Sequence, residues 1–184
     1  MTPLELALDI AQALDEHSVP YALGGALALS YWAVPRATAD VDINVFLPDE
    51  SLHELCAALA TISVELDLER ARLASAASGL IVLHAHAMRV DLFTPSIDFA
   101  WEAMRTRVSV TIDQRTVSLL SAEALAVFKL LFFRPKDIAD LQRLIGVRGA
   151  LLDVDYVRSN LVAMMGEDDD RVRRWDALVS DSKS

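Results

Sequence analysis

Hydrophobic and polar positions repeat along the chain with two different periods, and each period predicts one kind of element. Apolar residues at helical spacing, or short apolar runs bounded by Gly or Pro, predict helices at 4–16, 26–33, from 48 onward, 97–104, 122–132, 136–145, near 154–165 and near 168–179. Period-two or β-rich runs predict strands at Tyr21–Leu23, Asp40–Phe46, 61–69, a strand or hairpin over 80–95 bent near 84–86, and a hairpin over 107–120. The segment "ASAASGL" between two of these strands is expected to be a loop.

The order of these elements divides the chain into two parts. Strands and helices alternate up to residue 120, which predicts an α/β core over 1–120 with a mixed sheet flanked by helices. The remainder, 121–184, is expected to be a helical region packed on that core. Within it, Ser121 is placed to cap one helix and Pro135 to divide that helix from the next.

Composition narrows the class of protein. A chain of 184 residues with 53% hydrophobic and 24% charged residues is typical of a soluble globular protein. No apolar run approaches the roughly 20 residues of a membrane span. The amino terminus lacks the basic flank of a signal peptide, so we expect a cytoplasmic protein with no membrane contact. The single Cys56 excludes an internal disulfide.

The net charge of −10 opposes long-range attraction to nucleic acids and favours cationic small molecules. Basic residues nevertheless gather in short segments such as "LQRLIGVR" and "RVRR", so a local basic surface is compatible with an acidic whole. Charge alone therefore leaves the substrate class open.

Two carboxylates interrupt the apolar strand "DVDINVF". Asp40 and Asp42 are two residues apart, so they point to one face of the strand together with Asn44, while Val41 and Ile43 face the core. Adjacent carboxylates repel unless a cation joins them, and carboxylate oxygens are ligands that Mg²⁺ prefers. The alternative is a polar row that simply faces solvent.

A third acid, Asp91, interrupts the later strand "MRVDLF" in the same way. If the two strands are neighbours, three carboxylates can share two Mg²⁺ ions, the arrangement used for in-line nucleotidyl transfer. The alternative for Asp91 is an exposed position paired with Arg89 on the same strand face.

The double glycine Gly24–Gly25 predicts a turn that opens a short helix. Backbone amides at such a turn are suited to binding a triphosphate. The segment matches neither a dinucleotide fingerprint nor a Walker loop, so the glycines alone are a weak signal.

Charged residues of the helical region supply further candidates. Lys129 lies among apolar neighbours at helical spacing, so its ammonium needs an anionic partner such as a phosphate, unless it reaches solvent along the helix surface. Asp137 and Asp140 bind a nucleotide base or ribose, or cap and brace their helix. Capping is expected for Asp137, whereas both alternatives stay open for Asp140.

These motifs resemble the nucleotidyltransferase superfamily of the polymerase-beta type. The resemblance rests on the glycine pair, on "RATADVD" with Arg36, Thr38, Asp40 and Asp42, and on the later strand Asp91. Together with "VFKLLFFRPKDIADLQRL", residues 20–145 are similar to the AbiEii- and MenT-type toxins of bacterial toxin–antitoxin systems.

The resemblance implies a Mg²⁺-dependent enzyme that uses a nucleoside triphosphate. It implies two Mg²⁺ ions on the three aspartates, Asp91 as general base and Lys129 as a further catalytic residue. The nucleotide-binding residues expected in this reading are Gly24, Gly25, Arg36, Thr38, Lys129 and Asp140.

The activity implied is that of a toxin that transfers nucleotides to the 3′ end of tRNA and blocks aminoacylation, with a cognate antitoxin protein as partner. Two alternatives remain. One is a related enzyme that modifies an aminoglycoside, a lincosamide or a protein. The other is a binding module, which would be expected to have lost one of the acids, whereas this chain keeps all three.

Overall fold

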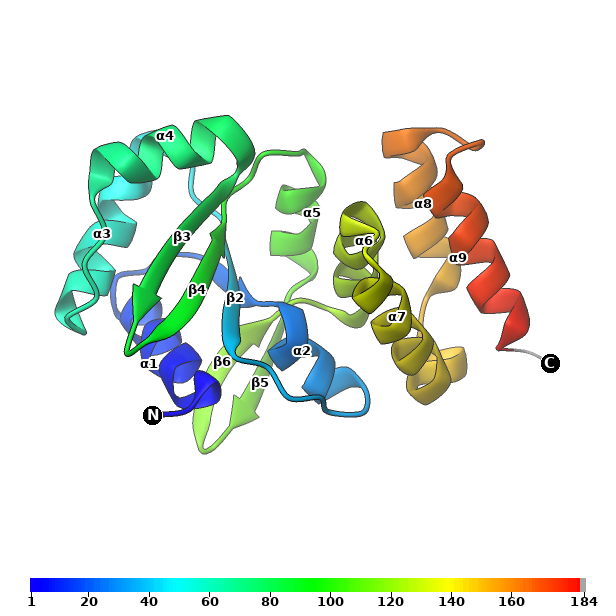
Figure 1. Ribbon diagram of the computed structural model, residues 1–184, viewed down its shortest axis with the longest axis horizontal. Helices are drawn as coiled ribbons and strands as arrows, with labels where there is room; N and C mark the ends of the chain where they lie inside the picture. The colour runs from blue at the N-terminus through cyan, green and yellow to red at the C-terminus, as the bar shows by residue number, and fades with distance from the viewer. Residues whose placement is uncertain (183–184) are drawn as a thin grey trace. The chain divides into compact units, whose positions relative to one another are not determined.

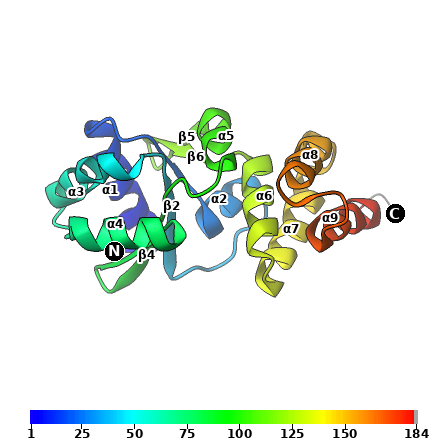
Figure 2. The same cartoon turned by 90° about the horizontal axis from the view of Figure 1, so that it is seen from above.

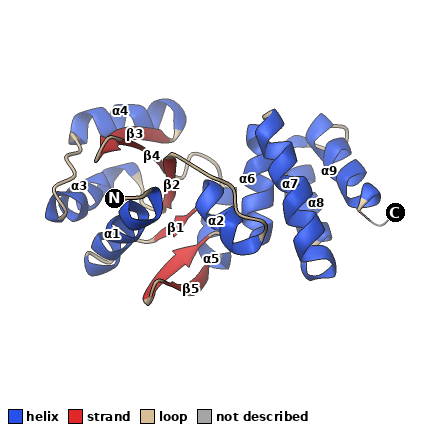
Figure 3. Cartoon of the chain, turned by 60° about the horizontal axis from the view of Figure 1, so that its bottom comes forward, coloured by secondary structure: helices blue, strands red, loops and turns tan. Residues whose placement is uncertain are grey.

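The computed structural model describes residues 1–182, whose elements are drawn in Figures 1 and 3. The helices are α1 Pro3–Glu16, α2 Gly25–Trp32, α3 Leu52–Thr61, α4 Leu68–Ser78, α5 Phe99–Thr106, α6 Ala122–Phe132, α7 Pro135–Arg148, α8 Val154–Met165 and α9 Asp170–Asp181, with short 3-10 turns at Asp49–Ser51 and Gly149–Leu151. The strands are β1 Tyr21–Leu23, β2 Asp40–Val45, β3 Leu80–Ala85, β4 Met88–Phe93, β5 Val108–Ile112 and β6 Arg115–Leu119.

The chain separates into two compact units, which we describe in turn. Unit 1 comprises Met1–Leu27 and Ala37–Leu120, and unit 2 comprises Ala28–Arg36 and Ser121–Ser184. Unit 1 ends at Leu120. The segment Ala28–Arg36 was expected in the core but lies in unit 2, because its side chains contact helices of that unit: the Arg148 guanidinium lies 5.1 Å from the centre of the Trp32 ring.

Unit 1 is built on a six-stranded sheet in the order β3-β4-β2-β1-β6-β5. The pairs β2–β4 and β1–β6 are parallel, whereas β1–β2, β3–β4 and β5–β6 are antiparallel. The sheet is therefore mixed, as predicted. One face of β2 and β4 is fully buried through Val41, Ile43, Val90 and Leu92, in a core that includes apolar residues of α1, α3 and α4.

One predicted strand of unit 1 is wrong. Residues 61–69 were expected to be a strand, but α3 ends at Thr61 and α4 begins at Leu68. The following segment "ASAASGL" was expected to be a loop, but most of it belongs to α4, which ends at Ser78. The caps of α4 explain the difference. The Asp67 side chain accepts a hydrogen bond from the Arg70 amide at 2.8 Å, and Gly79 ends the helix in the left-handed conformation.

The predicted hairpins of unit 1 are confirmed. The chain between β3 and β4 turns at His86 and Ala87, both at positive φ, close to the bend expected near 84–86. This turn places β4 beside β3 on one side and beside β2 on the other.

Unit 2 contains the helices α6, α7, α8 and α9, which pack on one another (Figure 2). Ser121 caps α6 as predicted, because its hydroxyl accepts a hydrogen bond from the Ala124 amide at 3.1 Å. Pro135 is the first residue of α7. Trp175 is buried and donates its indole N–H to the Val154 carbonyl at 3.1 Å, which ties α9 to the start of α8. Within residues 1–182, the structure contains no helix with the length and apolar character of a membrane span.

Candidate functional site

Neighbouring strands bring the three predicted carboxylates to one face of the sheet in unit 1. In the parallel pair β2–β4, Asp42 lies directly opposite Asp91, and Asp40 lies opposite Arg89. Because residues two apart on a strand share a face, all four side chains project from the face opposite the buried core. We call Asp40, Asp42, Asp91 and Arg89 the carboxylate face. The strand adjacency that the sequence left open is therefore present.

Arg89 supplies a positive charge to this face. Its Nε donates to Asp91 Oδ1 at 2.7 Å, which is the pairing that the sequence offered as the alternative for Asp91. The hydrogen bond to Asp91 and the charge of that carboxylate raise the pKa of Arg89 above its ordinary value, and the charges of Asp40 and Asp42 raise it further. One guanidinium thus shares this strand face with three carboxylates and pairs with Asp91.

The carboxylate face suits a divalent metal in its chemistry, although its side chains are not gathered around one point. Within residues 1–182, no three His, Cys, Asp or Glu side chains form a ready-made metal cluster. Asp91 instead accepts a hydrogen bond from the Arg89 guanidinium. Hard carboxylate oxygens on neighbouring strands are the donor set that Mg²⁺ prefers. Asp40, Asp42 and Asp91 therefore have the donor chemistry of a Mg²⁺ site, and metal binding by them stays a prediction.

The two glycines make room for this face. Gly25 has a φ of +53°, and a Cβ atom built on it would lie 1.8 Å from Asp42 Oδ2. A Cβ on Gly24 would lie 2.8 Å from Asn44 Nδ2, and the Gly24 amide donates to the Asp42 carbonyl at 2.9 Å. Any side chain at Gly25 would displace the Asp42 carboxylate. The Gly24 amide is therefore already hydrogen-bonded to β2. Triphosphate binding at this turn stays a prediction.

Thr38 anchors the start of β2. Its hydroxyl donates to the Asp40 carbonyl at 3.1 Å and lies 3.3 Å from the Asp40 amide. These contacts fix the backbone of the first carboxylate of the motif. The phosphate contact expected for the Thr38 hydroxyl remains a prediction.

The other predicted site residues form a buried ion cluster in unit 2. Lys129 on α6 is only 4% exposed, and its Nζ lies 2.7 Å from Asp140 Oδ2 and 3.7 Å from Asp137 Oδ1, both on α7. The anionic partner that the sequence demanded for Lys129 is thus supplied by the chain itself. A role for Lys129 in catalysis or phosphate binding remains a prediction.

Asp140 is the centre of this cluster. It accepts hydrogen bonds from Arg36 Nε at 3.0 Å and from Arg36 Nη2 at 3.1 Å, in addition to those from Lys129 and from Arg143 Nη1 at 3.1 Å. Burial alone would raise the pKa of Asp140, but the hydrogen bonds and charges of Arg36 and Lys129 outweigh it and hold that pKa below its ordinary value. Asp140 and Arg36 are therefore bound to each other, and their nucleotide-binding roles stay predictions.

Two further residues of the cluster, Asp137 and Arg143, can be recognised from their spacing along α7. The Asp137 carboxylate accepts from the Arg134 amide at 3.2 Å, which confirms the predicted capping of α7. Arg143 was missed, although it follows Asp140 at the three-residue spacing that brings helix side chains together.

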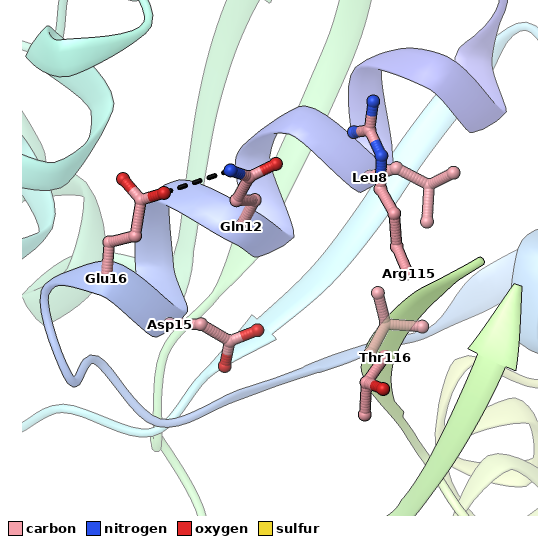
Figure 4. A pocket seen from close by; sticks show the side chains of 7 residues that line it. Leu8, Gln12, Asp15, Glu16, Arg115 and Thr116 are labelled. Atoms are coloured by element: carbon pink, nitrogen blue, oxygen red, sulfur yellow. Dashed lines mark hydrogen bonds between the residues drawn. The ribbon is translucent and has the colours of Figure 1, made fainter. Parts of the chain in front are cut away.

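Unit 1 contains a pocket whose lining includes none of the predicted site residues (Figure 4). Its volume is about 250 Å³, and it is lined by Leu8, Gln12, Asp15 and Glu16 of α1 and by Arg115, Thr116 and Val117 of β6. Asp15 also accepts a hydrogen bond from the buried Tyr21 hydroxyl at 2.9 Å, and burial together with this contact raises the pKa of Tyr21. Asp15 is thus bound within the fold, and the pocket adds nothing to the carboxylate chemistry.

Comparison with known proteins gives a family match and several matches to solved structures, two of which are described below. A family model described as aminoglycoside-2''-adenylyltransferase matches residues 6–144. The solution structure of the antibiotic-resistance factor ANT(2'')-Ia has a TM-score of 0.60 and 17% identity, over 100% of this chain and 99% of that chain. The crystal structure of ANT(2'')-Ia in complex with adenylyl-2''-tobramycin has a TM-score of 0.51 and 16% identity, over 97% of this chain and 95% of that chain. No curated protein matches the chain.

Proposed function

The chain belongs to the aminoglycoside-2''-adenylyltransferase family, and from this premise we propose that it transfers an adenylyl group from ATP to a hydroxyl group of an aminoglycoside. The observation that carries the proposal is the carboxylate face, in which Asp42 lies opposite Asp91 in register and Asp40 projects from the same side. This face offers the acidic side chains that nucleotidyl transfer requires, in a unit matched by the family model.

The proposed reaction is an in-line displacement at the α-phosphorus of ATP. The acceptor hydroxyl oxygen forms a bond to that phosphorus, the bond to the bridging oxygen of the β-phosphate breaks, and pyrophosphate leaves. The proton of the hydroxyl passes to the Asp91 carboxylate, which acts as general base. Asp40 and Asp42 would hold Mg²⁺ with Asp91, and the ion would offset the negative charge of the phosphates.

The remaining predicted residues take supporting roles in this proposal. Gly25 leaves the space that Asp42 occupies and keeps the turn close enough for phosphate oxygens to approach. Thr38 fixes the Asp40 backbone. Nucleotide-binding roles are also proposed for Arg36, Lys129 and Asp140 within unit 2, where Arg36, Lys129 and Arg143 donate hydrogen bonds to the Asp140 carboxylate.

The distribution of charge supports a cationic acceptor. Unit 1 contains 16 Asp and Glu against 6 Lys and Arg, which gives a net charge of −10, whereas unit 2 contains 11 of each and is neutral. The carboxylate face thus belongs to the unit that carries the entire net charge. A field of this sign attracts a polycationic aminoglycoside and opposes a polyanionic RNA. The tRNA-directed toxin activity expected from the sequence, with its antitoxin partner, has no comparable support.

The proposal is tested by an acceptor panel. Purified protein is incubated with Mg²⁺ and each α-labelled nucleoside triphosphate, together with tobramycin, a lincosamide, total tRNA or a protein mixture. We expect label from ATP on tobramycin with release of pyrophosphate, and no label on tRNA. Label on tRNA alone would establish the toxin activity instead, and label on protein would overturn both.

A matched pair of variants assigns the labelling to the carboxylate face. Asp42→Asn should reduce transfer by at least about a thousandfold, because it removes a charge at the reacting centre. Asp98→Asn makes the same change at an exposed residue of unit 1 whose side chain makes no capping hydrogen bond to α5. Its activity should match that of the unmodified protein.

A further inference from the structure

Arg89 has a position on the carboxylate face that catalysis by three acids does not explain. It occupies β4 two residues before Asp91 and lies opposite Asp40 in register, so it projects from the same face as all three carboxylates. It is the only basic residue among the β2 and β4 positions of that face. Its nearest acid is Asp91, the residue proposed as general base, at 2.7 Å.

We propose that Arg89 is a positioning residue that holds Asp91 in the metal-free protein and is displaced from it when a divalent metal binds. The inference deepens the proposed function and rests on Asp40, Asp42 and Asp91 being the metal ligands. Arg89 and the metal would offset the same three negative charges. Because Asp91 Oδ1 already accepts a hydrogen bond from Arg89, that oxygen would be available to a metal ion, and Asp91 to act as a base, only after the guanidinium has moved.

The solvent exposure of the Arg89–Asp91 ion pair supports displacement of Arg89 by a metal ion. The Arg89 side chain is 46% exposed and that of Asp91 14%, so the guanidinium reaches solvent while the carboxylate remains on the sheet. An ion pair at the surface is weak and opens at little cost. The Arg89 side chain has a long flexible stem, whereas the backbone of Asp91 is fixed by the register with Asp42. Displacement would thus move the Arg89 side chain and allow the Asp91 carboxylate to turn toward Asp42, while the two strand backbones keep their register.

The same arrangement explains why the side chains are not gathered as a metal cluster. With Arg89 bound, Asp91 Oδ1 is directed to the guanidinium, and no three acidic, His or Cys side chains within residues 1–182 converge on one point. The charges of Asp40 and Asp42 also raise the pKa of Arg89, so the cation remains charged throughout the neutral range. The exchange is consequently a competition between two cations and involves no titration.

Binding of Mn²⁺ to the full chain, without nucleotide or acceptor, tests the inference independently of the reaction. The free ion is measured by electron paramagnetic resonance. Arg89→Met should tighten Mn²⁺ binding by up to about fivefold, because it removes a competing surface ion pair that contributes at most about 1 kcal/mol. Arg105→Met removes the same charge from unit 1 at an exposed pair with Glu102 and should change the affinity less than twofold. Equal effects of the two variants, or weaker binding by Arg89→Met, would overturn the inference.

Two further measurements keep the result interpretable. In an Asp91→Asn background, Arg89→Met should lose most of its effect, because the contact that competes with the metal is already broken; an undiminished effect contradicts the mechanism. On the unmodified chain, the Arg89 Nε–H resonance should be protected from exchange without metal and lose that protection with Mg²⁺. A resonance that Mg²⁺ leaves unchanged overturns displacement, whichever acceptor the enzyme uses.

Discussion

Gly25 shows how closely the backbone approaches a candidate catalytic side chain. Its positive φ favours glycine, but the stronger constraint is the Asp42 carboxylate, which fills the space where a Cβ atom would lie. A β-carbon there forces either the turn or the carboxylate to move. The glycine is therefore required by the geometry of Asp42 as well as by any phosphate.

Gly25→Ala should abolish adenylyl transfer and destabilise the protein by more than the roughly 1–2 kcal/mol expected for a residue held at positive φ. Gly149→Ala is a control for positive φ without a side-chain contact, because Gly149 has a φ of +50° and, apart from its own chain neighbours, no described residue has an atom within 4 Å of its added Cβ. Chemical denaturation and the transfer assay measure both effects. Equal losses of stability in the two variants would show that contact with Asp42 is unimportant.

Two helices of unit 2 are joined by a buried ion pair. The ammonium of Lys129 on α6 and the carboxylate of Asp140 on α7 are both almost inaccessible to solvent, and Arg36 and Arg143 complete the shell of Asp140. Removing one partner from such a pair leaves an uncompensated buried charge. The cluster therefore binds α6, α7 and the segment ending at Arg36 into one unit.

Asp140→Asn should lower the free energy of unfolding by about 3–5 kcal/mol at neutral pH. Because the folded pKa of Asp140 lies below its ordinary value, its contribution is complete above about pH 4 and is lost as the pH falls through the folded pKa. The difference from the unmodified protein should thus shrink below about pH 4 in urea unfolding. Asp176→Asn on α9, at a half-exposed pair with Arg158 on α8, should have only a small effect at any pH. If the difference in free energy of unfolding between Asp140→Asn and the unmodified protein persisted in acid, the ion cluster would not be its source.

The whole molecule separates charge between its two units. All of the net charge of −10 belongs to unit 1, which also contains the carboxylate face, whereas unit 2 is neutral despite its many ion pairs. An acidic unit of this kind steers cationic ligands toward it at low salt. The total charge of the chain conceals this division.

Added salt should therefore lower kcat/KM for a cationic acceptor. Raising the ionic strength from about 0.05 M to about 0.5 M should lower kcat/KM for an aminoglycoside on the order of tenfold, because the added ions screen unit 1. The same aminoglycoside with its amines acetylated should show a much smaller dependence. Steady-state kinetics at fixed ATP measure kcat/KM for both acceptors. Equal salt dependence of the two values would refute steering by charge.

Periodicity predicted most elements because the two faces of a strand or helix have different neighbours. The alternation in "DVDINV" predicted β2 and the face of its acids, and Ser121 and Pro135 predicted the starts of two helices. The alternation of apolar residues at 61–69 predicted a strand that the structure does not contain, because this segment spans the end of α3 and the start of α4. There the caps at Asp67 and Gly79, and not the apolar pattern, set the boundaries.

The sequence by itself determined the elements, the acids of the carboxylate face and the superfamily resemblance, because these depend on local spacing. Tertiary structure alone decided that Asp42 lies opposite Asp91, that Arg89 binds Asp91 within this face, and that Gly25 leaves room for Asp42. It also placed Lys129 on Asp140, where the sequence suggested a phosphate. Such pairings join residues from separate segments, and they depend on strand order and helix packing, which no local pattern specifies.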